Sequence, residues 1–158
     1  MYEMGTLGII HLISAIAAMI FGAIVLFLKK GTPLHIRLGY FYAVSMLILN
    51  GTALMIYDLF GYFGPFHFAA IISLISLLGG LVPVYLKKPK NSWLELHYEF
   101  MNWSIIGLYA AFWSETFSRF FRFAGFWVLV ATGTAMTISI GAYVLKSKKR
   151  TILDRYSG

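Results

Sequence analysis

Residues 11–35, HLISAIAAMIFGAIVLFLKKGTPLH, decide the class of fold. The stretch opens on His11, continues as an apolar run long enough to cross a hydrocarbon core of about 30 Å, and closes on a lysine pair before His35. The same order of features returns at residues 67–97, HFAAIISLISLLGGLVPVYLKKPKNSWLELH, which hold the other two of the 4 histidines. The pattern therefore predicts membrane-spanning helices, and its recurrence predicts an internal repeat.

The composition excludes an ordinary soluble domain. Of the 158 residues, 59% are hydrophobic and only 12% are charged, whereas soluble domains carry about 25% charged residues. We expect an all-α, polytopic membrane helical bundle over residues 1–145, followed by a basic cytoplasmic tail over residues 146–158. The five expected spans are residues 6–28, 38–60, 66–86, 96–120 and 124–145, each to within a few positions. Because the chain has no cysteine, disulfides and thiolate metal sites are excluded.

The cations predict the orientation of these spans. On one side of the expected membrane lie 11 of the 13 Lys and Arg residues, while Arg119 and Arg122 lie on the other. Because cytoplasmic loops carry an excess of Lys and Arg, we expect the N-terminus outside and the C-terminus in the cytoplasm. The net charge of +7 then belongs to loops beside the headgroups of the lipid bilayer, and no nucleic acid partner is expected.

The first four spans are expected to form a parallel two-helix repeat. Both halves begin outside, so an axis along the membrane normal would relate them. Such an axis would place His11 opposite His67 near the outer face and His35 opposite His97 at the cytoplasmic face. Taken singly, each histidine also has a structural explanation; His35, which follows a proline, would cap the second span.

Paired histidines in a membrane bundle favour a cofactor. Neutral imidazoles from facing helices are the axial ligands of b-type haem. The first hypothesis is therefore that His11, His67, His35 and His97 bind haem b for membrane electron transfer.

A second hypothesis is a metal site at the outer face, formed by His11, Asp58, His67 and Glu115. Two imidazoles and two carboxylates suit a divalent metal such as zinc, iron or manganese, and an open position would permit metal-dependent catalysis. Glu115 also has a simpler explanation, since Arg119 follows it by one helical turn.

The third hypothesis needs no cofactor. A small, aromatic-rich membrane protein with short loops also suits an accessory or assembly subunit of a larger membrane complex, and a redox complex or a second copy of the chain would be the partner. Small residues at helical spacing in the fifth span, Gly133, Thr137 and Gly141, predict close contact with a neighbouring helix.

Two segments carry a family resemblance. KKGTPLHIRLGYFYAVSM and LELHYEFMNWSIIGLYAAFWSE, together with the following Arg119, resemble the predicted membrane proteins grouped as "domain of unknown function 2306". The resemblance covers roughly residues 7–122 and leaves the fifth span largely outside.

The residues that fit the family pattern are His35, Arg37, Gly39, His97, Met101 and Arg119. Ile36 displaces the arginine from its usual place directly after the histidine. The family has no assigned activity, so the resemblance implies that His35 and His97 matter without implying a reaction.

Overall fold

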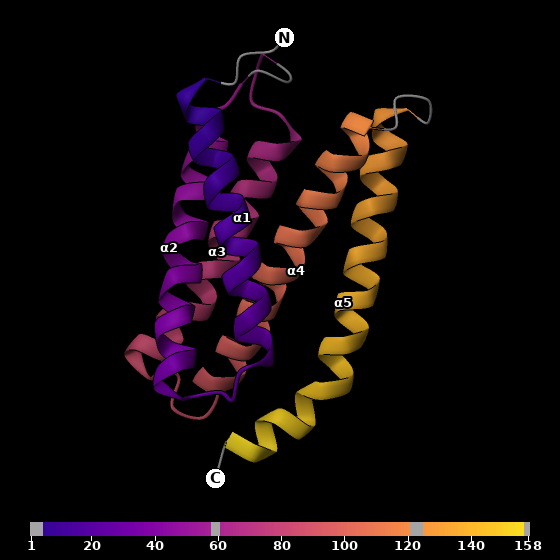
Figure 1. Cartoon of the computed structure of the whole chain (residues 1–158). Helices are drawn as coiled ribbons and strands as arrows, with labels where there is room; N and C mark the ends of the chain where they lie inside the picture. The colour runs from indigo at the N-terminus through magenta and orange to yellow at the C-terminus, as the bar shows by residue number, and fades with distance from the viewer. Residues whose placement is uncertain (1–4, 58–60, 121–124, 157–158) are drawn as a thin grey trace. The chain divides into compact units, whose positions relative to one another are not determined.

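The computed structural model describes residues 5–57, 61–120 and 125–156, and this part of the chain contains five helices and no strand (Figure 1). The helices are α1 (Thr6–Phe27), α2 (Pro33–Met55), α3 (Pro65–Leu86), α4 (Trp93–Phe120) and α5 (Phe126–Tyr156). The predicted all-helical class is confirmed. Among the described residues, α1, α2, α3 and α5 are long and apolar enough to cross a membrane, which gives four candidate spans where five were expected.

Helix α2 begins five residues earlier than hydropathy suggested, because local capping sets its start. Thr32 has extended backbone angles, and its hydroxyl accepts a hydrogen bond from the backbone N–H of His35 at 3.2 Å. Pro33 occupies the first helical position, where its missing N–H costs nothing. Ser/Thr capping followed by proline is a strong signal for a helix start.

Lys30 satisfies the free carbonyl groups at the end of α1. Its ammonium donates to the carbonyl oxygens of Val25 and Leu26, both at 2.8 Å. The last carbonyls of a helix have no intrahelical partner, and a cation at this end also interacts favourably with the helix dipole. One of the two lysines that mark the end of the first apolar run is therefore part of the helix terminus itself.

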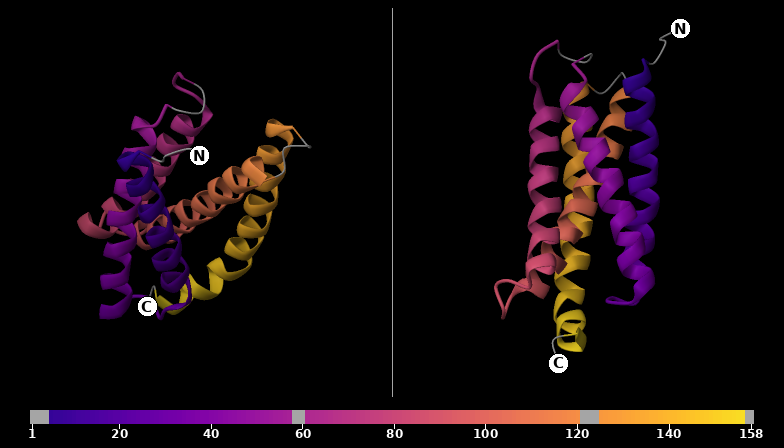
Figure 2. Two further views of the ribbon diagram at one scale, coloured as in Figure 1. Left: turned by 45° about the horizontal axis from the view of Figure 1, so that its top comes forward. Right: turned by 90° about the vertical axis from the view of Figure 1, so that its left-hand side faces the viewer.

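The chain divides into an N-terminal unit, residues 1–77, and a C-terminal unit, residues 78–158. In the N-terminal unit α1 packs lengthwise against α2, and the two run in opposite directions (Figures 1 and 2). Ala18 of α1 and Tyr42 and Met46 of α2 are almost completely buried. Phe21 stacks on Phe41 between the two helices, with ring centroids 5.3 Å apart.

In the C-terminal unit α4 packs lengthwise against α5 (Figure 1). Two of the small residues predicted to contact a neighbouring helix, Gly133 and Gly141 of α5, lie at this contact. A Cβ atom on Gly141 would come within 2.6 Å of the Ile106 side chain, and one on Gly133 would contact Ser114. The glycines let the two backbones approach each other closely, as small residues do between helices in lipid.

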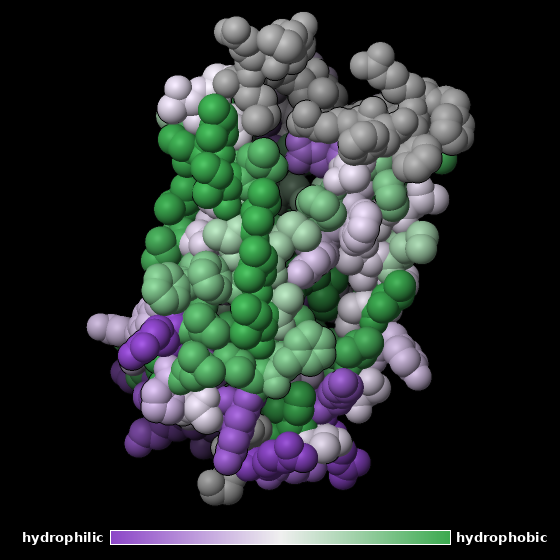
Figure 3. All heavy atoms as spheres, viewed as in Figure 1, coloured by the Kyte–Doolittle hydropathy of each residue, from purple (hydrophilic) through white to green (hydrophobic). Residues whose placement is uncertain are grey.

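Large apolar side chains remain exposed along the candidate spans. Figure 3 shows hydrophobic side chains covering the visible faces of α1 and α2, and Ile13, Ile20 and Phe27 of α1 are 62%, 53% and 89% exposed. Apolar surface on this scale is unfavourable in water and favourable in lipid.

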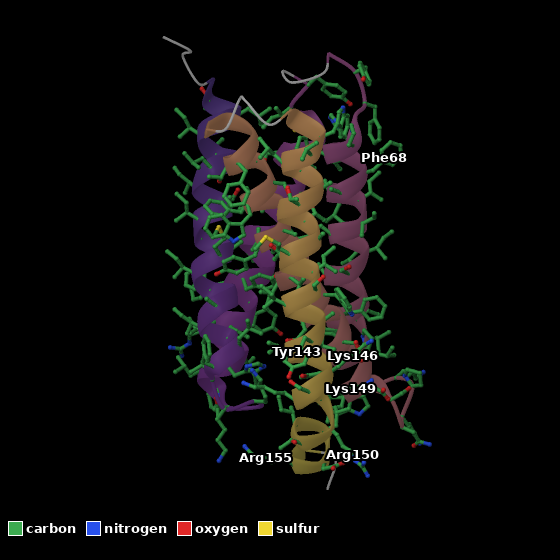
Figure 4. The ribbon with its side chains drawn as sticks, turned by 90° about the vertical axis from the view of Figure 1, so that its right-hand side faces the viewer. Phe68, Tyr143, Lys146, Lys149, Arg150 and Arg155 are labelled. Atoms are coloured by element: carbon green, nitrogen blue, oxygen red, sulfur yellow. The ribbon has the colours of Figure 1, made fainter. Side chains whose placement is uncertain are left out.

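The basic tail continues α5 as a helix through Tyr156. Figure 4 shows its cationic side chains gathered along the last turns, where Lys146, Lys149, Arg150 and Arg155 follow Tyr143.

Candidate functional site

A hydrogen bond links the side chain of His11 on α1 to α2. Its Nδ1 lies 3.0 Å from the hydroxyl of Thr52. That hydroxyl also lies 2.9 Å from the carbonyl oxygens of Ile48 and Leu49, which can only accept. A hydroxyl has one proton to donate, so donating it to a carbonyl leaves the oxygen to accept from the histidine. His11 is therefore assigned the tautomer with its proton on Nδ1 and the lone pair on Nε2.

His97 has the same tautomer for a simpler reason. Its Nδ1 lies 2.9 Å from the carbonyl oxygen of Gly80 on α3, and a carbonyl oxygen can only accept. One turn further along α4, Met101 packs on the same glycine. A Cβ atom at Gly80 would come within 2.7 Å of the Met101 Cγ and Sδ atoms. The structure thus brings together His97 and Met101, both singled out from the sequence, and adds Gly80 as their common contact.

His67 has the opposite tautomer. It is only 3% exposed, and its Nδ1 accepts a hydrogen bond from the backbone N–H of Gly64 at 3.1 Å. The proton must then sit on Nε2, which is buried and has no hydrogen-bond partner in the described part of the chain. The ring lies between Tyr57 and Phe63, with centroid distances of 4.5 and 4.7 Å.

The position of His67 explains this contact. Pro65 opens α3, so His67 is its third residue and reaches back to the N–H of Gly64. A side chain at the third helical position that accepts from the residue before the helix is half of a capping box, a role usually taken by Glu or Gln. His35 also occupies the third position of α2, again two residues after a proline. This shared Pro-x-His pattern was present in the sequence and was missed.

The two predicted histidine pairs remain predictions. His11 and His67 bond different partners through Nδ1, Thr52 and Gly64 respectively. His35 belongs to the N-terminal unit and His97 to the C-terminal unit.

The predicted metal site at the outer face also stays a prediction, because Asp58 lies outside the described residues. Among the residues that are described, no group of three or more His, Asp or Glu is placed to hold a metal ion. Glu115 is half-buried on α4, and the side chain of Arg119 lies outside the described set. Arg37 is exposed near the start of α2.

One charged cluster was not anticipated. Lys149 of α5 lies 2.6 Å from a carboxylate oxygen of Glu95 and 2.6 Å from one of Glu99, both on α4. The two acids are four residues apart and so share one face of the helix. That spacing was visible in the sequence, but the basic tail was not expected to continue the fifth helix.

Comparison with known proteins places the whole helical chain in one family. The family model described as "Predicted membrane protein (DUF2306)" matches residues 8–148. The match therefore includes most of α5, which the sequence resemblance had left outside. No curated protein matches the chain, and no solved structure matches it. The four helices that are apolar enough to cross a membrane agree with this family description. Because the family model matches nearly the full length, the chain belongs to the DUF2306 family of integral membrane proteins.

Proposed function

We propose that this membrane protein binds haem b, or a single metal ion, through histidine and serves electron transfer in the membrane. The observation that carries the proposal is the hydrogen bond from His97 Nδ1 to the Gly80 carbonyl. Histidines that bind a metal through Nε2 almost always donate their other ring proton to a carbonyl, carboxylate or water, which fixes the tautomer and the ring orientation. His11 is held in the same tautomer by Thr52.

The four predicted ligands do not fit the proposal equally. His97 and His11 have the lone pair on Nε2, as an iron or metal ligand requires. His67 would first have to give up its bond with Gly64 and move its proton, so we assign it to capping α3. His35 stays the proposed partner of His97, as the sequence repeat suggests.

When bound, haem supplies one-electron redox chemistry whose potential depends on its ligands and their hydrogen bonds. The contribution of the chain is to hold each imidazole in place. Met101 supports the same site by packing on Gly80 beside His97.

The finer membrane arrangement is part of the proposal. We place the N-terminus outside and the C-terminus in the cytoplasm, on the strength of the 11 cations expected on one side. We include α4 as the fifth span, because 28 residues make a helix about 42 Å long, more than the thickness of the hydrocarbon core. The parallel repeat rests on the recurrence of the histidine and lysine pattern in the sequence.

An absorption spectrum of protein purified after haem-supplemented expression tests the cofactor. We expect a Soret band that shifts on reduction, or a stoichiometric metal by elemental analysis. His97→Ala should lose the cofactor, whereas His67→Gln, which can still accept from Gly64, should keep it. Protein that contains neither haem nor stoichiometric metal would refute the proposal, as would a His97→Ala variant with full cofactor content.

One observation favours the alternative that the protein is an accessory subunit of a larger complex, namely the exposed apolar side of α5. Met136, Ile140 and Tyr143 are 63%, 62% and 75% exposed. Native gel electrophoresis of mildly solubilised membranes tests this alternative. Migration as part of a defined larger complex, by protein that contains no cofactor, favours the accessory role, and migration as the isolated chain argues against it.

A further inference from the structure

A shallow, open groove lies on the surface of α2. Its volume is about 240 Å³, and it is lined by Arg37, Tyr40, Phe41 and Val44. These residues follow the spacing of a single helix face, so the groove runs along α2 for about 10 Å, roughly a third of a hydrocarbon core. One end is cationic and the rest is apolar.

One apolar side chain of the groove packs against the neighbouring helix. Phe41 stacks on Phe21 of α1, which fixes the orientation of its ring. Tyr40, Phe41 and Val44 nevertheless remain 60%, 51% and 54% exposed. The stacking therefore orients Phe41, and the apolar lining of the groove remains exposed.

The charge at the end of the groove is not neutralised within its own unit. The described residues of the N-terminal unit, 5–57 and 61–77, contain no Asp or Glu. Lys30 of the same basic loop is already bound to the carbonyls that end α1. Arg37 is thus a cation next to an apolar groove without a carboxylate partner in this part of the chain.

We infer that the groove binds an anionic phospholipid, with its phosphate on Arg37 and one acyl chain along Tyr40, Phe41 and Val44. A guanidinium matches the geometry of phosphate through paired N–H donors. A soluble anion would use Arg37 alone and leave the apolar lining without a role. The site is independent of the proposed histidine chemistry.

Lipid retention tests the inference. The full-length protein is reconstituted in nanodiscs of equal parts phosphatidylcholine and phosphatidylglycerol, exchanged into mild detergent, and analysed by native mass spectrometry. Arg37→Gln should lower retained phosphatidylglycerol about fivefold, the effect of about 1 kcal/mol for one cation at a lipid headgroup. Val44→Trp, which fills the groove, should lower it to a similar extent.

Two controls separate a built site from general attraction. Lys29→Gln removes an exposed cation of the same loop, and Leu47→Trp introduces the same indole ring at an exposed position on α2 that does not line the groove. Both should retain phosphatidylglycerol as the wild type does, and circular dichroism confirms that each variant is folded. If Lys29→Gln and Arg37→Gln lose equal amounts of phosphatidylglycerol, the lipid is held by nonspecific charge attraction and the inference is overturned. Full retention by Val44→Trp, or complete displacement of the lipid by inorganic phosphate, would overturn it as well.

Discussion

Replacing Gly80 by alanine tests the contact that holds His97. The added Cβ atom would lie 2.7 Å from Met101 Cγ and Sδ and 3.1 Å from the Met101 backbone nitrogen. The side chain of Met101 can rotate away, but the backbone nitrogen moves only with α4. Overpacking of this kind costs about 1–3 kcal/mol, from which about 0.5–1 kcal/mol is recovered because alanine is the better helix former. We expect a net loss of about 1 kcal/mol in the free energy of unfolding.

Gly107→Ala is the matched control, since Gly107 lies in α4 and has nothing within 4 Å of its Cβ position. The free energy of unfolding of that variant should rise by about 0.5–1 kcal/mol. The assay is unfolding by sodium dodecyl sulfate in mixed micelles, followed by far-ultraviolet circular dichroism. Gly80→Ala should also lose cofactor, because the carbonyl that orients His97 moves. The reasoning is refuted if Gly80→Ala and Gly107→Ala are equally stable.

Three further outcomes follow from side-chain contacts. His67→Leu should lower the thermal midpoint through loss of about 1 kcal/mol of capping, whereas His67→Gln keeps an acceptor for the N–H of Gly64 and should lower it less. Equal midpoints for the two variants would contradict the capping role. Lys149→Ala leaves Glu95 and Glu99 as like charges one turn apart and should cost about 0.5–1 kcal/mol in the free energy of unfolding. Lys149→Arg keeps the positive charge and is the conservative control. An effect of the same size at high salt would contradict an ionic origin. Ser114→Ala breaks the partly buried hydrogen bond of 2.9 Å between the hydroxyls of Ser114 on α4 and Thr134 on α5. The loss should cost about 1 kcal/mol in the free energy of unfolding by denaturant titration, and an unchanged midpoint would show that the bond contributes nothing.

The helices and their membrane character were predictable because they depend on local composition. Apolar runs and the lysines beside them locate α1 and α3 to within a residue or two. Hydropathy failed at the start of α2, where the cap formed by Thr32 and Pro33 determines the first turn. That signal was also local and would have corrected the boundary.

The contacts of the histidines were less predictable. The sequence singled out His97 and Met101, but their meeting point at Gly80 depends on how closely α3 and α4 approach. The partner of His11, Thr52, is 41 residues away and reads in the sequence as an unremarkable helix residue. Pairings between helices follow from packing, which one sequence does not contain. The role of His67, by contrast, depends only on its distance from Pro65, and it could have been deduced.

The contact of Lys149 with Glu95 and Glu99 contributes to the register of α4 against α5. The chain joins the two helices at one end, and these three side chains join them at the other. Sliding one helix past the other by a single turn, about 5.4 Å, would leave the ammonium within reach of at most one of the two carboxylates. The Ile106 side chain of α4 lies within 2.6 Å of the Cβ position of Gly141, so such a slide would also move Ile106 out of the space that the glycine leaves. We therefore expect α4 and α5 to keep one defined alignment, set jointly by the charges at one end of their contact and by the fit of Ile106 over Gly141.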